Sequence, residues 1–358
     1  MFSRLFYSLK LNELCYFFLK FFVGKRIGLG YEQARVKLKS FSPKPIGNCS
    51  SNGGIGSPVY DLEVIIPAYN SEKYISKCLE SVLNQKTDYS FHVILVDDGS
   101  SDSTCTIAEK YSSDKLSVIR QKNGGTSKAR NTGINNSRGR YLMFVDSDDE
   151  LPPNTIQALM EKAFMNSSDI VEGSADYTLN DRRFRYYSHE NCSDTDFKQV
   201  NACIWGKVFS RDLFESFRFP EGYWYEDTVD GFFFYRLAKK VSTIPDVVYI
   251  YRNNAEGMTS VTRKKPKALD TYWITELCLE EYFGRGFCID ERFISIMRNQ
   301  FVVNCKRMNE FEEEVQEAVF VLSYELLEKY KIPIEGSYLF KLMAKREFGK
   351  YRLYCLTH

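Results

Sequence analysis

Four short apolar runs in the first half of the chain each end in polar side chains, and this pattern constrains the fold more than any other. The runs span 62–67, 91–96, 116–120 and 141–145. The polar residues that follow them are Asn70, Asp97, Asp98, Asn123, Asp146 and Asp148. Segments with helical spacing separate the runs, which is typical of a parallel, doubly wound α/β sheet. Ligands bind such sheets at the carboxyl ends of the strands, so we expect these polar residues to line one site.

The chain divides into segments of different composition. Residues 1–45 are basic and rich in aromatic side chains, and residues 46–60 are rich in Pro, Gly and Ser, which is typical of a linker. We expect the α/β domain to extend over 61–265. Residues 266–358 carry apolar positions at helical spacing and predict a helical C-terminal region, with helices over 291–308 and near 338–348 among others.

The N-terminal segment has two interpretations. Between residues 1 and 44 nine Lys and Arg are opposed by Glu13 and Glu32 only, and Phe2, Leu5 and Phe6 fall on one helical face. A basic helix with an aromatic face can lie in a membrane interface. It can equally pack on the α/β domain with its basic face outward. No run reaches 18 apolar residues, so we expect a cytoplasmic protein, with peripheral contact at the cytoplasmic membrane face as the alternative.

Composition excludes several classes of protein and site. A net charge of +1 over 358 residues argues against a dedicated nucleic-acid binder. Ten Cys without a C-x-x-C pair, and three His, argue against a structural zinc site. Carboxylates are the ligands that remain, and they suit Mg²⁺ or Mn²⁺.

Two acidic clusters stand at predicted strand ends. Asp146 and Asp148, separated by Ser147, follow the run 141–145 directly and can hold a divalent cation together with diphosphate oxygens and water. Such a cation would neutralise charge on a departing nucleoside diphosphate. Asp97 and Asp98 end the second run, where a carboxylate can accept hydrogen bonds from a nucleobase or a ribose. They can also cap the helix that follows.

A glycine-rich turn precedes the predicted helix 124–137. Gly124 and Gly125 come before it, and Lys128 and Arg130 lie in its first turns. A helix N-terminus with nearby cations suits phosphate. The chain lacks G-x-G-x-x-G after its first strand and lacks G-x-x-x-x-G-K-[ST], which excludes the dinucleotide and P-loop classes.

Four motifs taken together resemble those of the family 2 glycosyltransferases, which have the GT-A fold. They are Ile65-Ile-Pro-Ala-Tyr-Asn70, Val96-Asp-Asp-Gly-Ser-Ser-Asp102, Asn123…Ala129-Arg-Asn-Thr-Gly133 and Phe144-Val-Asp-Ser-Asp-Asp149. The resemblance covers about 61–260. It implies a Rossmann-like, mostly parallel sheet, an activated donor that is usually a UDP-sugar, and inversion at the anomeric carbon.

The resemblance also implies roles for individual residues. Donor-binding positions match Pro67, Tyr69, Asn70 and Glu72, and the base-recognition position matches Asp97 or Asp98. The metal positions match Asp146 and Asp148, with Asp148 as the direct ligand. We include Gly125, Lys128, Arg130, Ser147 and Arg252 among the candidate donor-binding residues. Arg252 would reach the diphosphate or be a surface arginine at a strand end.

Inversion needs a general base that takes the proton of the acceptor hydroxyl. The best candidate is Asp227, with Glu226 second, in a stretch where the family commonly has a Glu-Asp pair after a Trp-x-Lys stretch like Trp205-Gly206-Lys207. The alternative is that the pair caps a predicted helix over 228–239.

The sequence therefore predicts a metal-dependent, inverting glycosyltransferase that acts on a glycan or lipid-linked hydroxyl in surface polysaccharide biosynthesis. Two other functions use similar chemical groups and fit the sequence less well. A nucleotidyltransferase would carry a glycine-rich loop with Arg and Lys after the first strand, where this chain has Ala68-Tyr-Asn-Ser-Glu72. A non-catalytic nucleotide-sugar-binding module would have lost Asp148 or Asp227, and both are present.

Overall fold

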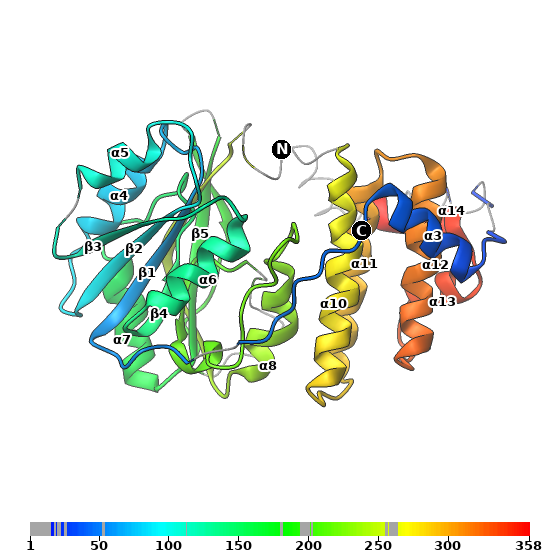
Figure 1. Cartoon of the computed structure of the whole chain (residues 1–358). Coiled ribbons are helices and arrows are strands. Elements are labelled where there is room, and N and C mark those ends of the chain that lie inside the picture. Colours follow the sequence, from blue (N-terminus) through cyan, green and yellow to red (C-terminus); the bar gives the residue numbers. More distant parts are fainter. Residues whose placement is uncertain are drawn as a thin grey trace. The chain divides into compact units, whose positions relative to one another are not determined.

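The protein forms two compact units. The computed structural model describes residues 16, 17, 19, 23, 24, 27–51, 54–111, 113–179, 182–193, 201, 203–254, 257 and 264–358. The α/β unit comprises 46–260, and the helical unit comprises 1–45 together with 261–358 (Figure 1). The N-terminal segment thus belongs to the same unit as the C-terminal helices, and the expected linker 46–60 belongs to the α/β unit.

The described strands of the α/β unit form one mixed, mostly parallel sheet. They are β1 (Tyr60–Ala68), β2 (Phe91–Asp97), β3 (Leu116–Arg120), β4 (Gly139–Phe144), β5 (Ile170–Leu179), β6 (Arg182–Tyr187), β7 (Lys207–Ser210) and β8 (Val241–Arg252). The order is β3-β2-β1-β4-β7-β5-β6, and β8 pairs with β5. β7 joins β4 and β5 in antiparallel pairs, while β1 to β4 and the pair β5–β8 are parallel. The predicted α/β fold class is confirmed.

The chain reverses its direction of winding at β1. From β1 it adds β2 and β3 on one side and then returns to place β4 on the other side. The carboxyl ends of β1 and β4 therefore flank a topological switch point, where open α/β sheets bind ligands. The loops that carry Asn70 and Asp146 begin at this point.

Helices cover the sheet of the α/β unit (Figure 1). They are α4 (Ile75–Leu83), α5 (Thr104–Glu109), α6 (Thr126–Asn136), α7 (Thr155–Asn166) and the short α8 (Tyr235–Leu237), with a 3₁₀ turn over Arg211–Phe214 and a π-helical turn over Asp230–Phe234. α6 packs on β1 and β2, and α7 packs on β5, β7 and β8. Burial of apolar side chains at helical spacing drives this packing, as with Ile75, Leu79 and Val82 on α4.

Close contact between α6 and the sheet depends on small residues. Ala129 packs against Ile94 and Val96 of β2. A Cβ atom on Gly133 would lie 2.4 Å from Cγ2 of Ile65, so only glycine permits this distance between helix and strand. The packing fixes the N-terminal end of α6, where Gly125, Lys128 and Arg130 lie.

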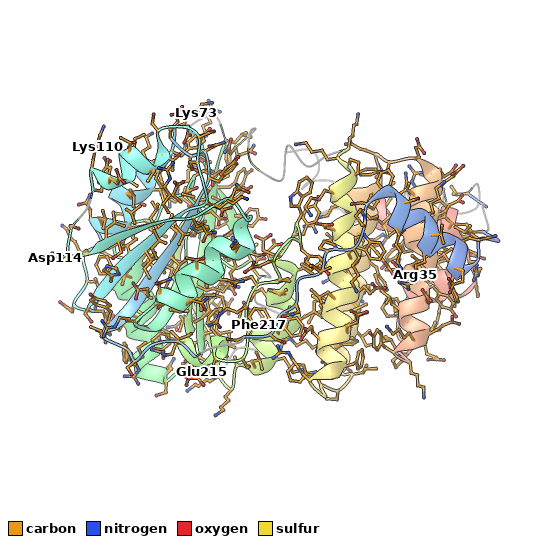
Figure 2. All side chains as sticks on the ribbon, viewed as in Figure 1. Arg35, Lys73, Lys110, Asp114, Glu215 and Phe217 are labelled. Atoms are coloured by element: carbon orange, nitrogen blue, oxygen red, sulfur yellow. The ribbon has the colours of Figure 1, made fainter. Side chains whose placement is uncertain are left out.

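Much of the phenylalanine content forms the core of the α/β unit. Its buried rings contact one another edge to face or tilted, in geometries typical of aromatic clusters. They are Phe144, Phe209, Phe214, Phe217, Phe219 and Phe234 (Phe217 is labelled in Figure 2).

The helical unit contains α3 and the C-terminal helices. Its described helices are α3 (Tyr31–Phe41), α10 (Asp270–Gly284), α11 (Glu291–Met308), α12 (Glu313–Lys329), α13 (Tyr338–Ala344) and α14 (Phe348–Thr357), with a 3₁₀ turn over Pro266–Leu269. α3 packs on α12 and buries Ala34 and Leu38 completely. None of the helices in the described part of the chain combines the length and apolarity needed to cross a membrane.

Basic side chains of the N-terminal segment pair with acidic residues of this unit. Arg35 of α3 lies 3.0 Å from Glu276 and 2.8 Å from Glu325 (Figure 2), and Lys44 lies 2.8 Å from Glu276 and 2.9 Å from Glu280. Residues 31–44 therefore use their positive charge within the helical unit. The expected aromatic face of residues 2–9 lies outside the described residues, as do Arg4, Lys10, Lys20, Lys25 and Arg26.

Candidate active site

An acidic loop follows β4 and is held in place by β8. The hydroxyl of Tyr249 accepts a hydrogen bond from the backbone N–H of Asp146 at 3.1 Å and donates to Oδ2 of Asp149 at 2.7 Å. The backbone N–H of Arg252 donates to Oδ1 of Asp149 at 2.7 Å. Asp149 is thus a buried anchor, which leaves Asp146 and Asp148 as the carboxylates that can face a ligand.

Arg252 and Asn254 hold Asp148 in place. Nε of Arg252 donates to the backbone carbonyl of Asp148 at 2.9 Å, and its guanidinium also pairs with Glu150. The amide of Asn254 donates to Oδ2 of Asp148 at 2.9 Å. Arg252 therefore braces the acidic loop, and its contact with a diphosphate stays a prediction.

Repulsion within this loop favours a cation. Burial, opposed by the bond from Asn254 and reinforced by the charge of Asp146, raises the pKa of Asp148. Burial and then the charges of Asp148 and Asp146 raise the pKa of Asp149 well above its usual range. Among the described residues no group of three or more His, Cys, Asp or Glu is arranged to hold a metal. Two carboxylates fit Mg²⁺ or Mn²⁺ when diphosphate oxygens and water complete the shell.

Arg130 joins the acidic loop to the Glu226–Asp227 segment. Its Nη2 lies 2.9 Å from Oδ1 of Asp146, and its Nη1 lies 2.6 Å from Oε1 of Glu226. Burial disfavours the charged guanidinium, but Asp146 and Glu226 outweigh that cost and raise the pKa of Arg130. Arg130 is 3% exposed, so its place is between two carboxylates rather than on an open phosphate site.

The two candidate bases differ in their surroundings. Glu226 is buried against Arg130, and burial raises its pKa while Arg130 opposes the rise. Asp227 is partly exposed, and within the described part of the chain no side chain or backbone N–H bonds its carboxylate. Tyr225, just before the pair, has a φ of 62°, a left-handed conformation that costs energy in a residue other than glycine.

The predicted helix over 228–239 is present over 228–237. The backbone N–H groups of Thr228, Val229 and Asp230 bond back three residues, and a π-helical turn over Asp230–Phe234 follows inside this helix. The fully buried Lys207 bonds to this helix. Its Nζ lies 3.0 Å from Asp230 and 2.5 Å from the hydroxyl of Tyr235, which fixes this turn to β7.

The buried Lys207 lies close to two carboxylates, those of Asp230 and Glu172. Nζ of Lys207 also lies 3.4 Å from Glu172 of β5. Burial raises the pKa of Asp230 to about 7, although Lys207 opposes the rise. Lys207 outweighs burial at Glu172 and lowers its pKa. One positive charge therefore holds together β5, β7 and the turn that follows Asp227.

Asp98 shapes the glycine-rich turn. Its carboxylate accepts hydrogen bonds from the backbone N–H groups of Gly125 at 2.7 Å and Gly124 at 3.0 Å, and from the amide of Gln121 at 2.7 Å. Gly125 has a φ of 87°, which favours glycine, and it stands directly before α6. Lys128, partly buried, lies in the first turn of that helix.

One carboxylate oxygen of Asp97 accepts no hydrogen bond from the described residues, whereas the other is bonded. Its Oδ1 accepts from the backbone N–H of Ser100 at 3.1 Å. Its Oδ2 has Nε of Arg120 at 3.4 Å and accepts no hydrogen bond from the described residues. Neither Asp97 nor Asp98 caps α5, because the N–H of Thr104 at its start bonds to Asp102.

The loop after β1 is tied to the loop after β2. Asn70 has a φ of 49°, donates its N–H to Oγ of Ser100 at 2.9 Å, and accepts from the N–H of Ser101 at 2.9 Å. Glu72 accepts from the N–H of Ser103 at 2.9 Å. Asn70 and Glu72 thus position this loop.

Three further donor-binding candidates differ in exposure. Pro67 is buried in β1, whereas Tyr69 is 52% exposed. Oγ of Ser147 lies 2.7 Å from Oγ of Ser71, which joins the first loop to the acidic loop. The predicted residues therefore come together at the carboxyl ends of the parallel strands.

Tyr249, Asn254 and Asp149 support the site and were not singled out from the sequence. The indole of Trp205 stacks on Tyr249, with ring centroids 4.5 Å apart and planes 14° apart. Trp205 also bridges to Phe144, the last residue of β4. In the sequence, Tyr249 and Tyr251 alternate with an isoleucine. This alternation indicates a strand that carries aromatic rings on one face.

The fold and the acidic switch-point site define the class of GT-A glycosyltransferases, and comparison with known proteins agrees. Residues 63–242 match the family described as Glycosyl transferase family 2. The chain belongs to this family.

Two curated relatives and one solved structure illustrate the similarity. The chain is 33% identical over 225 residues to glycosyltransferase GlyA of Streptococcus pneumoniae serotype 4, which covers 57% of this chain but only 32% of GlyA. It is 30% identical over 292 residues to the uncharacterized glycosyltransferase EpsJ of Bacillus subtilis, covering 74% of this chain and 84% of EpsJ. The crystal structure of Staphylococcus aureus TarS 1–349 in complex with UDP-GlcNAc has the same fold, with a TM-score of 0.65, 22% identity, and coverage of 82% of this chain and 89% of that one.

Proposed function

We propose that the protein transfers a glycosyl group from a UDP-sugar to a hydroxyl of a glycan or lipid-linked acceptor, with inversion, in the synthesis of a surface polysaccharide. One observation carries the proposal. Arg130 lies at 2.6 to 2.9 Å from both Glu226 and Asp146, so the candidate base segment and the candidate metal loop meet at the switch point. Family membership and the likeness in fold to a protein solved with UDP-GlcNAc support the choice of donor.

In this proposal the nucleoside binds over the β1 and β2 ends. Oδ2 of Asp97 accepts from the uracil imide or a ribose hydroxyl, and the nucleotide displaces Arg120, whose side chain is 65% exposed. Tyr69 contributes an exposed ring beside the base. Asp98 keeps the backbone of Gly124 and Gly125 in the shape that places the start of α6 and Lys128 near the diphosphate.

Asp148 and Asp146 would hold Mn²⁺ or Mg²⁺ on the diphosphate. The cation supplies Lewis-acid stabilisation of the departing UDP. The two carboxylates repel each other in the structure, and Oδ1 of Asp146 already bonds Arg130, which leaves its Oδ2 for the ion. Asn254 orients Asp148 from the opposite side.

Asp227 acts as the general base. The acceptor hydroxyl attacks the anomeric carbon in line with the C1–O bond of the donor, its proton passes to the Asp227 carboxylate, and UDP leaves with the bonding electrons. Glu226 is less suited, because it is buried and its charge is already paired with Arg130. In this proposal Glu226 positions the segment through Arg130, and Asp227 accepts the proton.

A titration tests this proposal. UDP, GDP, CDP and dTDP are each added with and without Mn²⁺ while the melting temperature is followed, because a ligand that binds only the native state raises it. We expect UDP to stabilise the protein and Mn²⁺ to increase the effect. The same titration on Asp227→Asn should be unchanged, whereas transfer or donor hydrolysis by that variant should be lost. Wild-type turnover by Asp227→Asn would remove Asp227 as the base.

A further inference from the structure

The β5–β6 hairpin presents aromatic side chains on one face. Tyr177 of β5 stands opposite Phe184 of β6, and their rings stack with centroids 5.4 Å apart. The ring of Tyr186, two residues along β6, lies 6.3 Å from that of Tyr177. Phe184 is 41% exposed and Tyr186 is 43% exposed, so the face is open to solvent.

These rings continue into the active site. Tyr186 lies 5.7 Å from Trp205 and 6.1 Å from Tyr251, measured between ring centroids. Trp205 stacks on Tyr249, whose hydroxyl holds the acidic loop through Asp149. We name Tyr177, Phe184, Tyr186, Trp205 and Tyr251 the aromatic ledge. Its rings contact one another from the buried Trp205, beside Tyr249, to the exposed hairpin.

The ledge also lies near the candidate base. Burial and then the charges of Cys203 and Asp227 raise the pKa of the Tyr186 phenol. Trp205 is two residues from Lys207, which fixes the turn after Asp227 through Asp230. The ledge and the base are therefore held by the same elements.

Sheet stability alone does not explain the ledge. Cross-strand pairing accounts for Tyr177 and Phe184, and edge strands are commonly protected by charge. That protection is supplied on the opposite face, where Arg183 and Arg185 lie 2.8 and 3.0 Å from Asp176. Phe184 and Tyr186 leave contiguous apolar surface exposed on the hairpin, and such surface can mark a binding site.

We propose that the aromatic ledge binds the acceptor as a chain of neutral pyranose residues. Aromatic rings pack against the C–H faces of sugars and leave the hydroxyls in water. The terminal residue has its hydroxyl toward Asp227, and the preceding residues follow Tyr186, Tyr177 and Phe184. The acceptor is thus an oligosaccharide of at least two residues. This proposal rests on the proposed function and adds the class of acceptor.

The experiment measures oligosaccharide binding to the full chain by calorimetry in the presence of UDP and Mn²⁺. The probes are linear β-linked glucose, β-linked N-acetylglucosamine and α-linked glucose oligomers of one to six units. For at least one series we expect affinity to rise with length and to level off after about four units. Phe184→Ala/Tyr186→Ala should weaken the longer oligomers about tenfold and leave the monomer unchanged, as expected from losing two ring contacts.

Tyr111→Ala is the matched control, because Tyr111 is a partly exposed aromatic residue whose hydroxyl bonds to Glu80 rather than to the ledge. It should bind like wild type. Sedimentation of all variants is measured in the same buffers. The inference is overturned if no series shows length dependence, if the ledge variant binds like wild type, or if the variant changes the mass of the particle and so identifies a contact between copies.

UDP binding distinguishes a failure of the aromatic-ledge proposal from a failure of the proposed function. A protein that binds UDP and no oligomer overturns the aromatic ledge and leaves the proposed function intact. A protein that does not bind UDP overturns the proposed function itself.

Discussion

Removing Arg130 should destabilise the α/β unit by a predictable amount. The guanidinium is 3% exposed and pairs with Glu226, which is 7% exposed, at 2.6 Å. Arg130→Met keeps most of the buried volume and leaves Glu226 as a buried carboxylate without its cation. Breaking a buried pair in this way costs about 3–5 kcal/mol.

The value for this chain should fall near the lower end of that range. The second partner, Asp146, has a side chain that is 30% exposed, so water can solvate it after Arg130 is lost. Arg130 also lies over the ring of Phe219 at 5.5 Å, a contact worth about 0.5–1 kcal/mol that methionine replaces in part. We therefore expect a loss of about 3 kcal/mol.

A double variant isolates the charge. Arg130→Met with Glu226→Gln removes the stranded carboxylate and should recover about 2 kcal/mol, because replacing both members of a buried pair is often close to neutral. Arg183→Ala is the control. It breaks an ion pair at 2.8 Å whose arginine is 45% exposed, and exposed pairs contribute about 1 kcal/mol or less.

Urea unfolding followed by tryptophan fluorescence measures these differences, since Trp205 and Trp224 lie in the α/β unit. Two results would refute the reasoning. One is an Arg130→Met protein within 1 kcal/mol of wild type. The other is a double variant no more stable than the single variant, which would show that the stranded charge is not the cause.

Three further changes give separate tests. Asp98→Ala removes the acceptor for the N–H groups of Gly124 and Gly125, so it should lower stability by about 1–3 kcal/mol and weaken UDP binding in calorimetry; unchanged affinity would contradict the role of this turn. Asp148→Ala should bind UDP equally with and without Mn²⁺, and a preserved Mn²⁺ effect would place the metal elsewhere. Asp230 has a pKa of about 7 when folded, against about 3.9 unfolded, so the folded state binds the extra proton between these values and stability falls as pH rises. Asp230→Asn should flatten the dependence of the unfolding free energy on pH between 4 and 7 by up to about 1.4 kcal/mol per pH unit, and an identical slope in both proteins would contradict the assignment.

Local patterns were sufficient to predict the parallel part of the sheet and the long helices. β3 and α11 begin and end where the apolar spacing placed them, over 116–120 and 291–308. β1, β2 and β4 differ from the predicted runs by at most two residues at each end. The bounds of these elements depend on which side chains are buried. The spacing of apolar residues in the sequence predicts those side chains.

Tertiary contacts decided the parts that differ. The predicted helix 228–239 is π-helical over Asp230–Phe234, where Asp230 pairs with the buried Lys207, 23 residues away in sequence. The predicted helix 338–348 ends at Ala344, Arg346 follows with a φ of 55°, and α14 begins at Phe348. No local pattern carries either feature.

The site shows the same division. Motifs placed Asp97, Asp146 and Asp148 at strand ends, because strand ends are defined locally. The bond between Arg130 and Glu226 spans 96 residues, and periodicity contains no information on such a pairing. The sequence was therefore sufficient to predict which chemical groups form the site. The residues that these groups bond to could be identified only from the structure.

The central claim is that this protein inverts the anomeric centre of a UDP-sugar, and the configuration of the first product tests it most directly. Water can replace the unidentified acceptor, so slow hydrolysis of a panel of α-linked UDP-sugars, UDP-GlcNAc among them, is followed by proton NMR before the free sugar mutarotates. We predict that the β anomer appears first, that its release requires Mn²⁺ or Mg²⁺, and that Asp227→Asn does not form it. Initial formation of the α anomer, or release of the β anomer by Asp227→Asn at the wild-type rate, would contradict the account.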